Sequence, residues 1–325
     1  MTAADTGIRP DRIVLGIALI VLSTLLTSLQ DVIFKYSSAD ITLWQLYVLR
    51  SIFLFPALLV IAFVWGGGTT TWRQAIRLWP IVRATLFVLM FLSMYSAIPV
   101  LPLSTIAAGL YTAPLFVAAL SALLIGEPVH PRGWLAIAIG FAGVLVILRP
   151  GTEAFTWLML LPVLAGFFYA LSALVTRSKC RVTPPAALGL AMSIALLFTG
   201  AVASTVLYIW QPAPSLVVVS PFLFGQWSAL DASQWGFVAV LALLMVCNSL
   251  ILPVAYQSAP SVTIATFDYC YIIFATVFGF AIFSEVPDRQ TIVGMLMIAG
   301  AGLMVSLGRN SNVSARPAAA AHIKG

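Results

Sequence analysis

Residues 102–127 read PLSTIAAGLYTAPLFVAALSALLIGE, and residues 260–285 read PSVTIATFDYCYIIFATVFGFAIFSE. Both stretches are apolar, and each is long enough to cross a membrane as a helix. An offset of 158 positions aligns identical residues in the two stretches: Pro102 with Pro260, Thr105 with Thr263, Tyr111 with Tyr269, Phe116 with Phe274, and Glu127 with Glu285. Matches at one fixed offset indicate that the chain contains an internal duplication.

Both stretches belong to a chain that has the composition of a membrane protein. Of its 325 residues, 62% are hydrophobic and 8% are charged, whereas soluble domains carry about 25% charged residues. So few polar side chains cannot cover the surface of a soluble globule, and most of the exterior must therefore face lipid. We expect an integral membrane protein of a bacterial inner (plasma) membrane.

Apolar runs long enough to cross a bilayer of ~30 Å occur repeatedly along the chain. Ten spans are expected, near residues 13–36, 42–65, 79–99, 103–126, 132–148, 155–177, 186–210, 235–257, 261–284 and 291–308. The first run resembles a signal peptide, but it is longer than the usual core of about 7 to 15 residues, which favours a retained span. The expected fold class is therefore all-α integral membrane, with ten transmembrane helices.

The duplication divides these spans into two repeats of five. An offset of 142 aligns the first span with the sixth and places Lys35 opposite Arg177. Because five is an odd number, the second repeat enters the membrane upside down, as in the inverted repeats of many secondary transporters. The alternative is that duplication reflects only how large helical bundles arise. The expected organisation is a cytoplasmic N-terminal segment 1–12, two five-helix repeats at 13–148 and 155–308, and a disordered cytoplasmic tail 309–325.

The fourth span of each repeat ends in a related motif that a Gly-rich helix follows. The motif reads Ile125-Gly126-Glu127-Pro128 in the first repeat and Phe283-Ser284-Glu285-Val286-Pro287 in the second. Over roughly residues 14 to 308 the chain resembles the EamA-type transporters of the drug/metabolite transporter (DMT) superfamily. Residues 30–36 and 283–289 are similar to its S-adenosylmethionine-uptake branch. The resemblance implies a ten-helix carrier without ATPase machinery and with a central cavity between the halves, but it names no cargo.

Basic residues orient the chain, because Lys and Arg are retained on the cytoplasmic side of short loops. With the N-terminus inside, most of the 16 Lys and Arg residues are cytoplasmic, and the outer side holds Lys35, Arg149 and Arg289. Both termini are then cytoplasmic. The basic residues are scattered singly, so the net charge of +6 does not indicate a nucleic-acid partner.

Charged side chains within the spans are the main site candidates, because a charge at the bilayer centre costs roughly 2.5 to 3.5 kcal/mol. Asp31 and Arg50 lie at depths that differ by roughly 6 Å, and we predict that they pair. The pair is either a structural link between two helices or a contact for the substrate. The first span carries polar residues at three- and four-residue steps: Thr24, Thr27, Ser28, Asp31 and Lys35. This spacing predicts one water-facing side.

Asp268 is the carboxylate of the ninth span, and the offset of 158 places it opposite Leu110. The repeat therefore does not require an acid at this position. We interpret Asp268 as a proton carrier or as a counter-ion for a cationic cargo. The alternative is a protonated structural acid bonded to Tyr271 or Asn248. Lys35, at the end of the first span, is either an interfacial cation or a ligand.

Polar side chains on other spans complete the set of candidate cavity residues: Tyr95, Tyr111, Tyr169, Ser172, Thr176, Asn248, Gln257 and Tyr271. Acids, an arginine and tyrosines together suit a small polar metabolite, either amino-acid-like or S-adenosylmethionine-like. The predicted function is secondary-active transport of such a solute by alternating access. The alternatives are an exporter of drugs, vitamins or other metabolites, and a non-transport membrane protein.

No enzymatic activity, cofactor or metal site is expected. The histidines, His130 and His322, lie outside the expected spans and form no metal-binding pattern, and no phosphate-binding P-loop is present. The expected partners are a small-molecule substrate and the lipid bilayer, with proton coupling through Asp268 as one interpretation. The protein is expected to be a monomer or a homodimer.

Two further features predict how the helices are connected and packed. The connection at 211–234 is rich in proline and aromatic residues, which favours an outer loop on the membrane interface, with a lid as the alternative. Glycines recur in the fifth and tenth spans: Gly140, Gly143, Gly294, Gly300 and Gly302. Small residues of this kind permit close helix packing within membranes.

Overall fold

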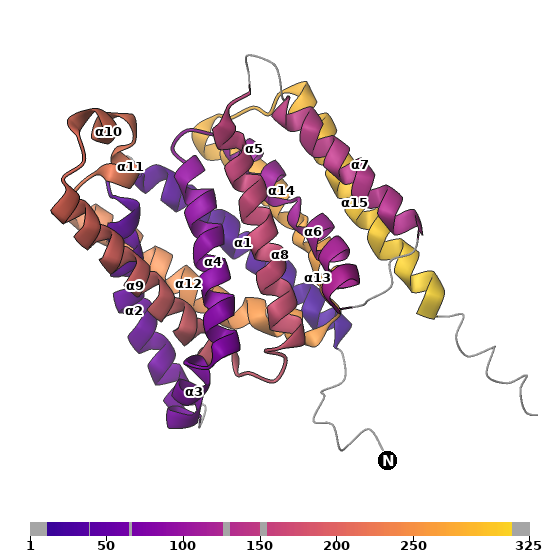
Figure 1. The fold of residues 1–325 in the computed structure, drawn as a ribbon, viewed down its shortest axis with the longest axis horizontal. Coiled ribbons are helices and arrows are strands. Elements are labelled where there is room, and N and C mark those ends of the chain that lie inside the picture. Colours follow the sequence, from indigo (N-terminus) through magenta and orange to yellow (C-terminus); the bar gives the residue numbers. More distant parts are fainter. Residues whose placement is uncertain (1–11, 39, 65–66, 126–130, 150–154, 314–325) are drawn as a thin grey trace, which may run out of the picture.

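The long apolar segments form helices because lipid offers no hydrogen-bond partners, so each segment must pair its own backbone groups. The computed structural model describes residues 12–38, 40–64, 67–125, 131–149 and 155–313, and these residues form helices and no strand (Figure 1). The long unbroken helices are α1 (Ile13–Ser37), α2 (Leu43–Val64), α4 (Leu78–Ala97), α7 (Pro131–Leu148), α8 (Leu160–Ser178), α9 (Pro185–Trp210), α12 (Ala232–Ser258) and α15 (Arg289–Val313). Shorter helices are α3 (Gly68–Ala75), α10 (Pro214–Val219), α11 (Pro221–Phe224) and a 3₁₀ turn at Trp157–Met159.

Eight helical segments of the described chain are long and apolar enough to cross a membrane. They are Ile13–Ser37, Leu43–Val64, Leu78–Ala97, Thr105–Leu124, Trp157–Ser178, Pro185–Trp210, Ala232–Ser258 and Thr263–Phe283. The apolar helix Trp134–Leu148 is shorter. The all-helical class is therefore confirmed, while the ten crossings stay a prediction. Helix α15 continues to Val313 and includes the start of the expected tail; residues 314–325 lie outside the described chain.

Two of the expected spans are broken at the position that the internal repeat shares. The fourth span consists of α5 (Leu103–Leu110), α6 (Ala113–Leu120) and a π-helical turn at Ser121–Ile125. The ninth consists of α13 (Ser261–Asp268) and α14 (Cys270–Phe283). The breaks fall at Tyr111 and Tyr269, which the offset of 158 aligns. Pro114 accounts for the first break, because it has no N–H group to donate to the Leu110 carbonyl.

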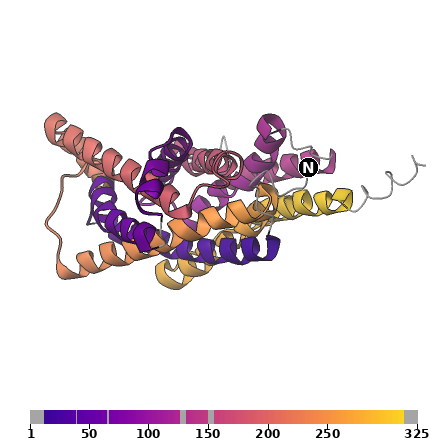
Figure 2. The same cartoon turned by 90° about the horizontal axis from the view of Figure 1, so that it is seen from below.

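Helices from the two halves of the chain pack against each other throughout the bundle. The main pairs are α1 with α12, α2 with α9, α4 with α8, and α7 with α15. The pair α7 and α15 forms one flank (Figure 1), and α1 and α12 lie on the opposite side of the bundle from α4 and α8 (Figure 2). The broken helices lie between the α7–α15 flank and the rest of the bundle. Residues of both breaks can therefore meet inside the protein.

The connection at 211–234 contains α10 and α11 and is anchored to the start of α2. Phe222 of α11 is buried, and the indole N–H of Trp44 donates a hydrogen bond to the Leu223 carbonyl at 2.8 Å. Val218 and Val219 of α10 remain about four-fifths exposed. In Figure 1 this connection and α3 lie at opposite ends of the bundle, as expected for segments on opposite sides of a membrane.

Glycines bring α7 and α15 into backbone contact. A Cβ atom on Gly294 would lie 2.7 Å from the Gly143 carbonyl oxygen, and a Cβ atom on Gly140 would lie 2.4 Å from the Leu115 side chain of α6. The expected close packing is therefore confirmed at these three positions. It is wrong at Gly300, where an added Cβ would meet nothing within 4 Å. The surroundings of Gly302 lie outside the described part.

Asp288 caps the N-terminal end of α15. Its Oδ1 accepts a hydrogen bond from the Thr291 N–H at 2.9 Å, and its Oδ2 is paired with Arg149. The hydrogen bonds from Thr291 and Arg149 lower the pKa of Asp288 from 3.8 to about 2. Since the pKa is lower in the folded protein, the carboxylate stabilises the fold at pH values above about 4.

Replacing Asp288 with Ala is expected to lower the free energy of unfolding by about 1 kcal/mol at neutral pH, because the cap is lost. The difference from the wild type is expected to shrink as the pH falls from about 4 towards 2, where Asp288 becomes protonated. Thermal unfolding in detergent across this range measures both effects. Asp40→Ala, at an exposed aspartate, is the control, and an equal loss in that variant would contradict the assignment.

Candidate functional site

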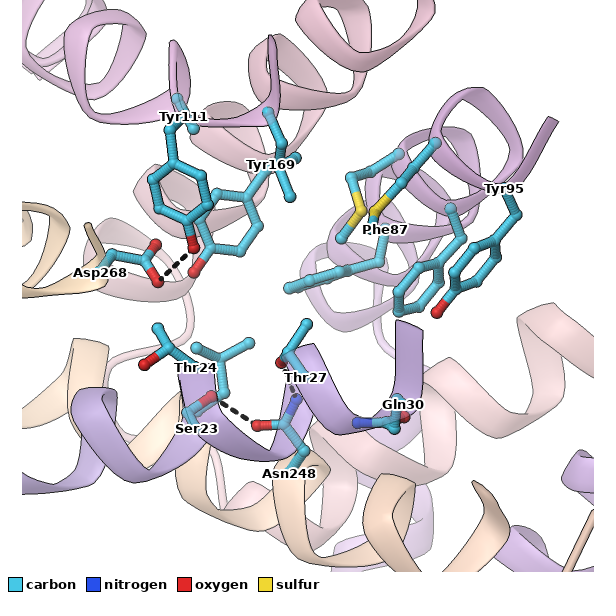
Figure 3. Close-up of a pocket in the computed structure, with 16 residues that line it drawn as sticks. Ser23, Thr24, Thr27, Gln30, Phe87, Tyr95, Tyr111, Tyr169, Asn248 and Asp268 are labelled. Atoms are coloured by element: carbon cyan, nitrogen blue, oxygen red, sulfur yellow. Dashed lines mark hydrogen bonds between the residues drawn. The ribbon is translucent and has the colours of Figure 1, made fainter. Parts of the chain in front are cut away.

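A cavity lies at the junction of the two halves and beside both helix breaks (Figure 3). Its lining comes from α1, α4, α5 and α6 in the first half and from α8, α12 and α13 in the second. It encloses about 50 Å³ of water-accessible space, and one water needs about 10–15 Å³. The cavity can therefore hold several waters or the polar part of a solute.

Asp268 is the acid of this cavity and the last residue of α13. Its side chain is almost fully buried, and its Oδ1 accepts a hydrogen bond from the Tyr111 hydroxyl at 3.5 Å. The hydroxyls of Tyr169 and Tyr256 lie close to the same carboxylate, and Tyr256 donates to Tyr169 at 3.3 Å. No Lys, Arg or His of the described chain lies within ion-pair distance of it. A buried carboxylate with only neutral donors is suited to bind a cationic group.

Hydroxyl and amide groups of α1 and α12 form a second wall, across the cavity from Tyr111 and Tyr169 (Figure 3). Ser23 donates to the Asn248 side-chain oxygen at 2.5 Å, and the Asn248 amide donates to the Thr27 hydroxyl at 2.9 Å. Thr24 lines the cavity beside them. Two residues of the polar stripe predicted on the first span, Thr24 and Thr27, therefore line the cavity.

A third wall consists of aromatic side chains on α4. Phe87, Phe91 and Tyr95 follow one another at four-residue steps and line the cavity. The Phe91 and Tyr95 rings are stacked with centroids 5.2 Å apart, and the Phe34 ring also stacks on Tyr95, with centroids 3.9 Å apart. This geometry offers a planar surface for a ring of a ligand. Sequence reasoning found Tyr95 but missed Phe87 and Phe91, although their helical spacing was a readable signal.

The structure divides the predicted site residues into two groups. Five line the cavity: Tyr95, Tyr111, Tyr169, Asn248 and Asp268. Four lie outside its lining: Asp31, Lys35, Arg50 and Tyr271. Asp268 is bonded to neither Tyr271 nor Asn248, the partners suggested for a structural acid, because both have other partners; the Tyr111 hydroxyl donates to it instead.

The predicted pairing of Asp31 with Arg50 is also wrong. No ion pair joins them, and Asp31 Oδ2 instead accepts a hydrogen bond from Tyr271 at 2.6 Å. The Arg50 guanidinium lies among aromatic rings, 5.0 Å from the centroid of Phe34 and 5.7 Å from that of Phe91. Position along a span predicts how deep each residue lies, but the direction in which its side chain points depends on the rotation of its helix.

Lys35 joins three segments at the end of the bundle rather than lining the cavity. It forms an ion pair with Glu285 and donates to the Leu101 carbonyl at 3.1 Å. Glu285 Oε2 in turn accepts from the Leu103 N–H at 2.9 Å. The glutamate of the second Glu-containing motif therefore ties the end of α14 to the ends of α1 and α5.

The remaining candidates from the sequence have structural contacts away from the cavity. The Gln257 amide donates to the carbonyls of Cys180 and Thr183, at 2.8 Å in each case. Thr176 accepts from Arg83 Nε at 2.7 Å, and Ser172 is buried without lining the cavity. Gln257 and Thr176 therefore link separate segments of the bundle, and the expected place of all three residues in the cavity lining is wrong.

Comparison with known proteins relates this chain to membrane carriers. Residues 14–149 match the EamA-like transporter family. A riboflavin transporter of Rhizobium johnstonii is 26% identical over 322 residues, which cover 94% of this chain and 95% of that protein. An S-adenosylmethionine uptake transporter of Rickettsia bellii is 25% identical over 294 residues, covering 90% and 93%. One crystal structure has a similar fold, with a TM-score of 0.61 at 14% identity, covering 92% of this chain and 97% of its own.

Proposed function

Because this chain belongs to the EamA-type transporters of the drug/metabolite transporter superfamily, we propose that it is a secondary-active carrier of a small polar metabolite. The observation that supports this proposal is the cavity shared by the two halves, with Asp268 at one helix break and Tyr111 at the other. Broken helices at a repeat interface are where secondary transporters bind their substrates. Alternating access then exposes this cavity to each side of the membrane in turn.

The proposed architecture is ten transmembrane helices in two inverted repeats, 13–148 and 155–308. Described helices occur within each of the ten expected segments, and both fourth spans are broken at aligned tyrosines. In Figure 1, α5 leads down into α6 whereas α13 leads up into α14, which supports opposite orientations of the two repeats. The proposed repeats leave a cytoplasmic segment 1–12 before them and a cytoplasmic tail after them.

We propose that both termini are cytoplasmic and that the membrane is a bacterial inner membrane. The excess of Lys and Arg on one side of the spans supports this orientation. The same orientation places α3 inside and the α10–α11 connection outside, in agreement with their positions at opposite ends of the bundle.

The proposed cargo is a cationic or zwitterionic metabolite that carries a heterocycle, such as an S-adenosylmethionine-like compound. Asp268 attracts the positive group, and the Phe91–Tyr95 stack receives the ring. Asn248 and the hydroxyls beside it bind polar substituents. A neutral flavin is the second candidate, since the same aromatic wall and hydroxyl-rich wall suit a planar ring with a polyol chain.

Exchange by the purified protein in lipid vesicles tests the proposal. Vesicles loaded with unlabelled S-adenosylmethionine are expected to take up labelled S-adenosylmethionine by counterflow well above protein-free vesicles. Competition with riboflavin, an amino acid and a sugar phosphate ranks the cargo classes. We expect the cation to compete at least about tenfold better than the anionic sugar phosphate, which corresponds to about 1.4 kcal/mol. Failure to exchange any compound of the panel would contradict the carrier function.

A further inference from the structure

A second buried acid, Asp31, lies outside the cavity but is connected to the acid within it. Asp31 is 1% exposed and accepts the hydrogen bond of Tyr271 at 2.6 Å. The Tyr271 ring stacks on Tyr111 with centroids 4.9 Å apart, and Tyr111 donates to Asp268. Two tyrosines, one from each half of the chain, therefore bridge the two carboxylates.

The surroundings of Asp31 leave one oxygen able to accept a proton. Oδ2 holds the bond from Tyr271, whereas Oδ1 is buried and has no hydrogen-bond partner among the described residues. A buried carboxylate oxygen without a donor is energetically unfavourable, and a proton on that oxygen removes the charge. Asp268 differs, because its carboxylate faces the cavity and several hydroxyls.

The charge of Asp31 affects how favourably the charge of Arg50 can be buried in the bundle. Its side chain is fully buried. The Tyr95 hydroxyl lies close to its guanidinium group, but none of the three nitrogens has a hydrogen bond of ordinary geometry to a described residue. An arginine keeps its charge in proteins, and Asp31 is the acid in its electrostatic neighbourhood. Protonation of Asp31 would remove the negative charge near this buried cation, which is energetically unfavourable. Such a state favours a conformation in which Arg50 reaches water.

We propose that Asp31 binds the coupling proton of the transport cycle, while Asp268 binds the substrate. One proton adds to Asp31 Oδ1 from one compartment and leaves the same atom towards the other compartment, so no other bond changes. Tyr271 and Tyr111 connect the two sites, because a shift of either acid moves the stacked pair. This assignment rests on the proposed carrier function and replaces Asp268 as the proton carrier.

Asp31 is surrounded by a defined set of other titratable and charged groups. Its electrostatic neighbours are Arg50 of α2, Tyr95 of α4, Tyr111 after α5 and Tyr271 of α14. On its own helix, Lys35 is already paired with Glu285. The packed helices α12 and α13 carry Cys247, Tyr256 and Asp268. Among these groups, Asp31 is the carboxylate beside Arg50. Protonation of Asp31 therefore removes the negative charge nearest to the Arg50 guanidinium.

The test compares exchange with uphill transport in vesicles at zero membrane potential. Coupling of one proton to each substrate molecule supports about tenfold accumulation of the substrate for a gradient of one pH unit. The gradient is applied in both directions, acidic inside and acidic outside. Asp31→Asn is expected to keep counterflow of labelled S-adenosylmethionine but to lose this accumulation. Asp40→Asn, at an exposed aspartate, is expected to keep both. Accumulation at the wild-type level in Asp31→Asn would overturn the proposal, as would wild-type exchange without any response to a pH gradient. Absence of wild-type exchange would instead count against the carrier function.

A second measurement needs no substrate and keeps the proposal testable if Asp31→Asn folds poorly. Infrared difference spectra of the purified protein during a pH titration are expected to contain a carboxyl band that Asp31→Asn lacks. Tyr271→Phe, which removes the hydrogen bond to Oδ2, is expected to move the pH at which this band appears. Tyr36→Phe, on the exposed side of the same helix, is the matched control. A spectrum that is identical in wild type and Asp31→Asn would overturn the proposal.

Discussion

Replacing Asp268 with Asn is expected to reduce counterflow of labelled S-adenosylmethionine to the level of protein-free vesicles. The carboxylate is buried in the cavity, and no described cation compensates it, so in the loaded carrier the substrate supplies the positive charge. Removing one partner of a buried, hydrogen-bonded charge pair costs about 2–5 kcal/mol. A loss of 2 kcal/mol already weakens binding by about 30-fold.

The variant is expected to insert and fold, because an amide has nearly the same shape and its oxygen still accepts a bond from Tyr111. Thermal unfolding and gel filtration in detergent check this point, and Asp40→Asn controls for loss of an aspartate elsewhere. If the cargo is a neutral flavin, riboflavin exchange is expected to survive the substitution, which separates the two cargo classes. Full exchange of S-adenosylmethionine by Asp268→Asn would remove this residue from the mechanism.

Replacing Gly294 with Leu is expected to destabilise the protein by about 3 kcal/mol, the upper part of the usual range for overpacking. The new Cβ would lie 2.7 Å from the Gly143 carbonyl oxygen and would also overlap Ile147. A backbone carbonyl cannot swing aside as a flexible side chain can, so α7 and α15 must separate. Thermal unfolding in detergent and the yield of monodisperse protein measure the effect.

Gly300→Leu provides a matched control on the same helix. A Cβ at Gly300 would meet nothing within 4 Å, so we expect its melting temperature to stay close to that of the wild type. The comparison holds helix propensity and added hydrophobicity constant, since both variants exchange Gly for Leu in α15. Equal destabilisation of the two variants would show that α7 and α15 do not pack as described.

Much of the fold was predictable from the order of residues, because lipid forces every long apolar segment to become a helix. The same reasoning located the polar side of the first span, whose Thr24 and Thr27 reach the cavity. The isolated acid at 268 was also recognised, because a carboxylate within an apolar run requires a polar or protein environment. The sequence also aligned Tyr111 with Tyr269, but the breaks of both fourth spans at these tyrosines were not predicted.

Other parts of the site followed only from the packed bundle. Asp31 and Arg50 have compatible depths, yet one bonds to Tyr271 and the other lies against Phe34 and Phe91. Lys35 reaches Glu285, 250 positions away in the chain. Periodicity predicts which residues of a helix share a face, and position along the span predicts how deep they lie. Both properties depend only on neighbouring residues in the sequence. Which faces meet depends on the rotation and neighbours of every helix, and these are set by packing between distant segments.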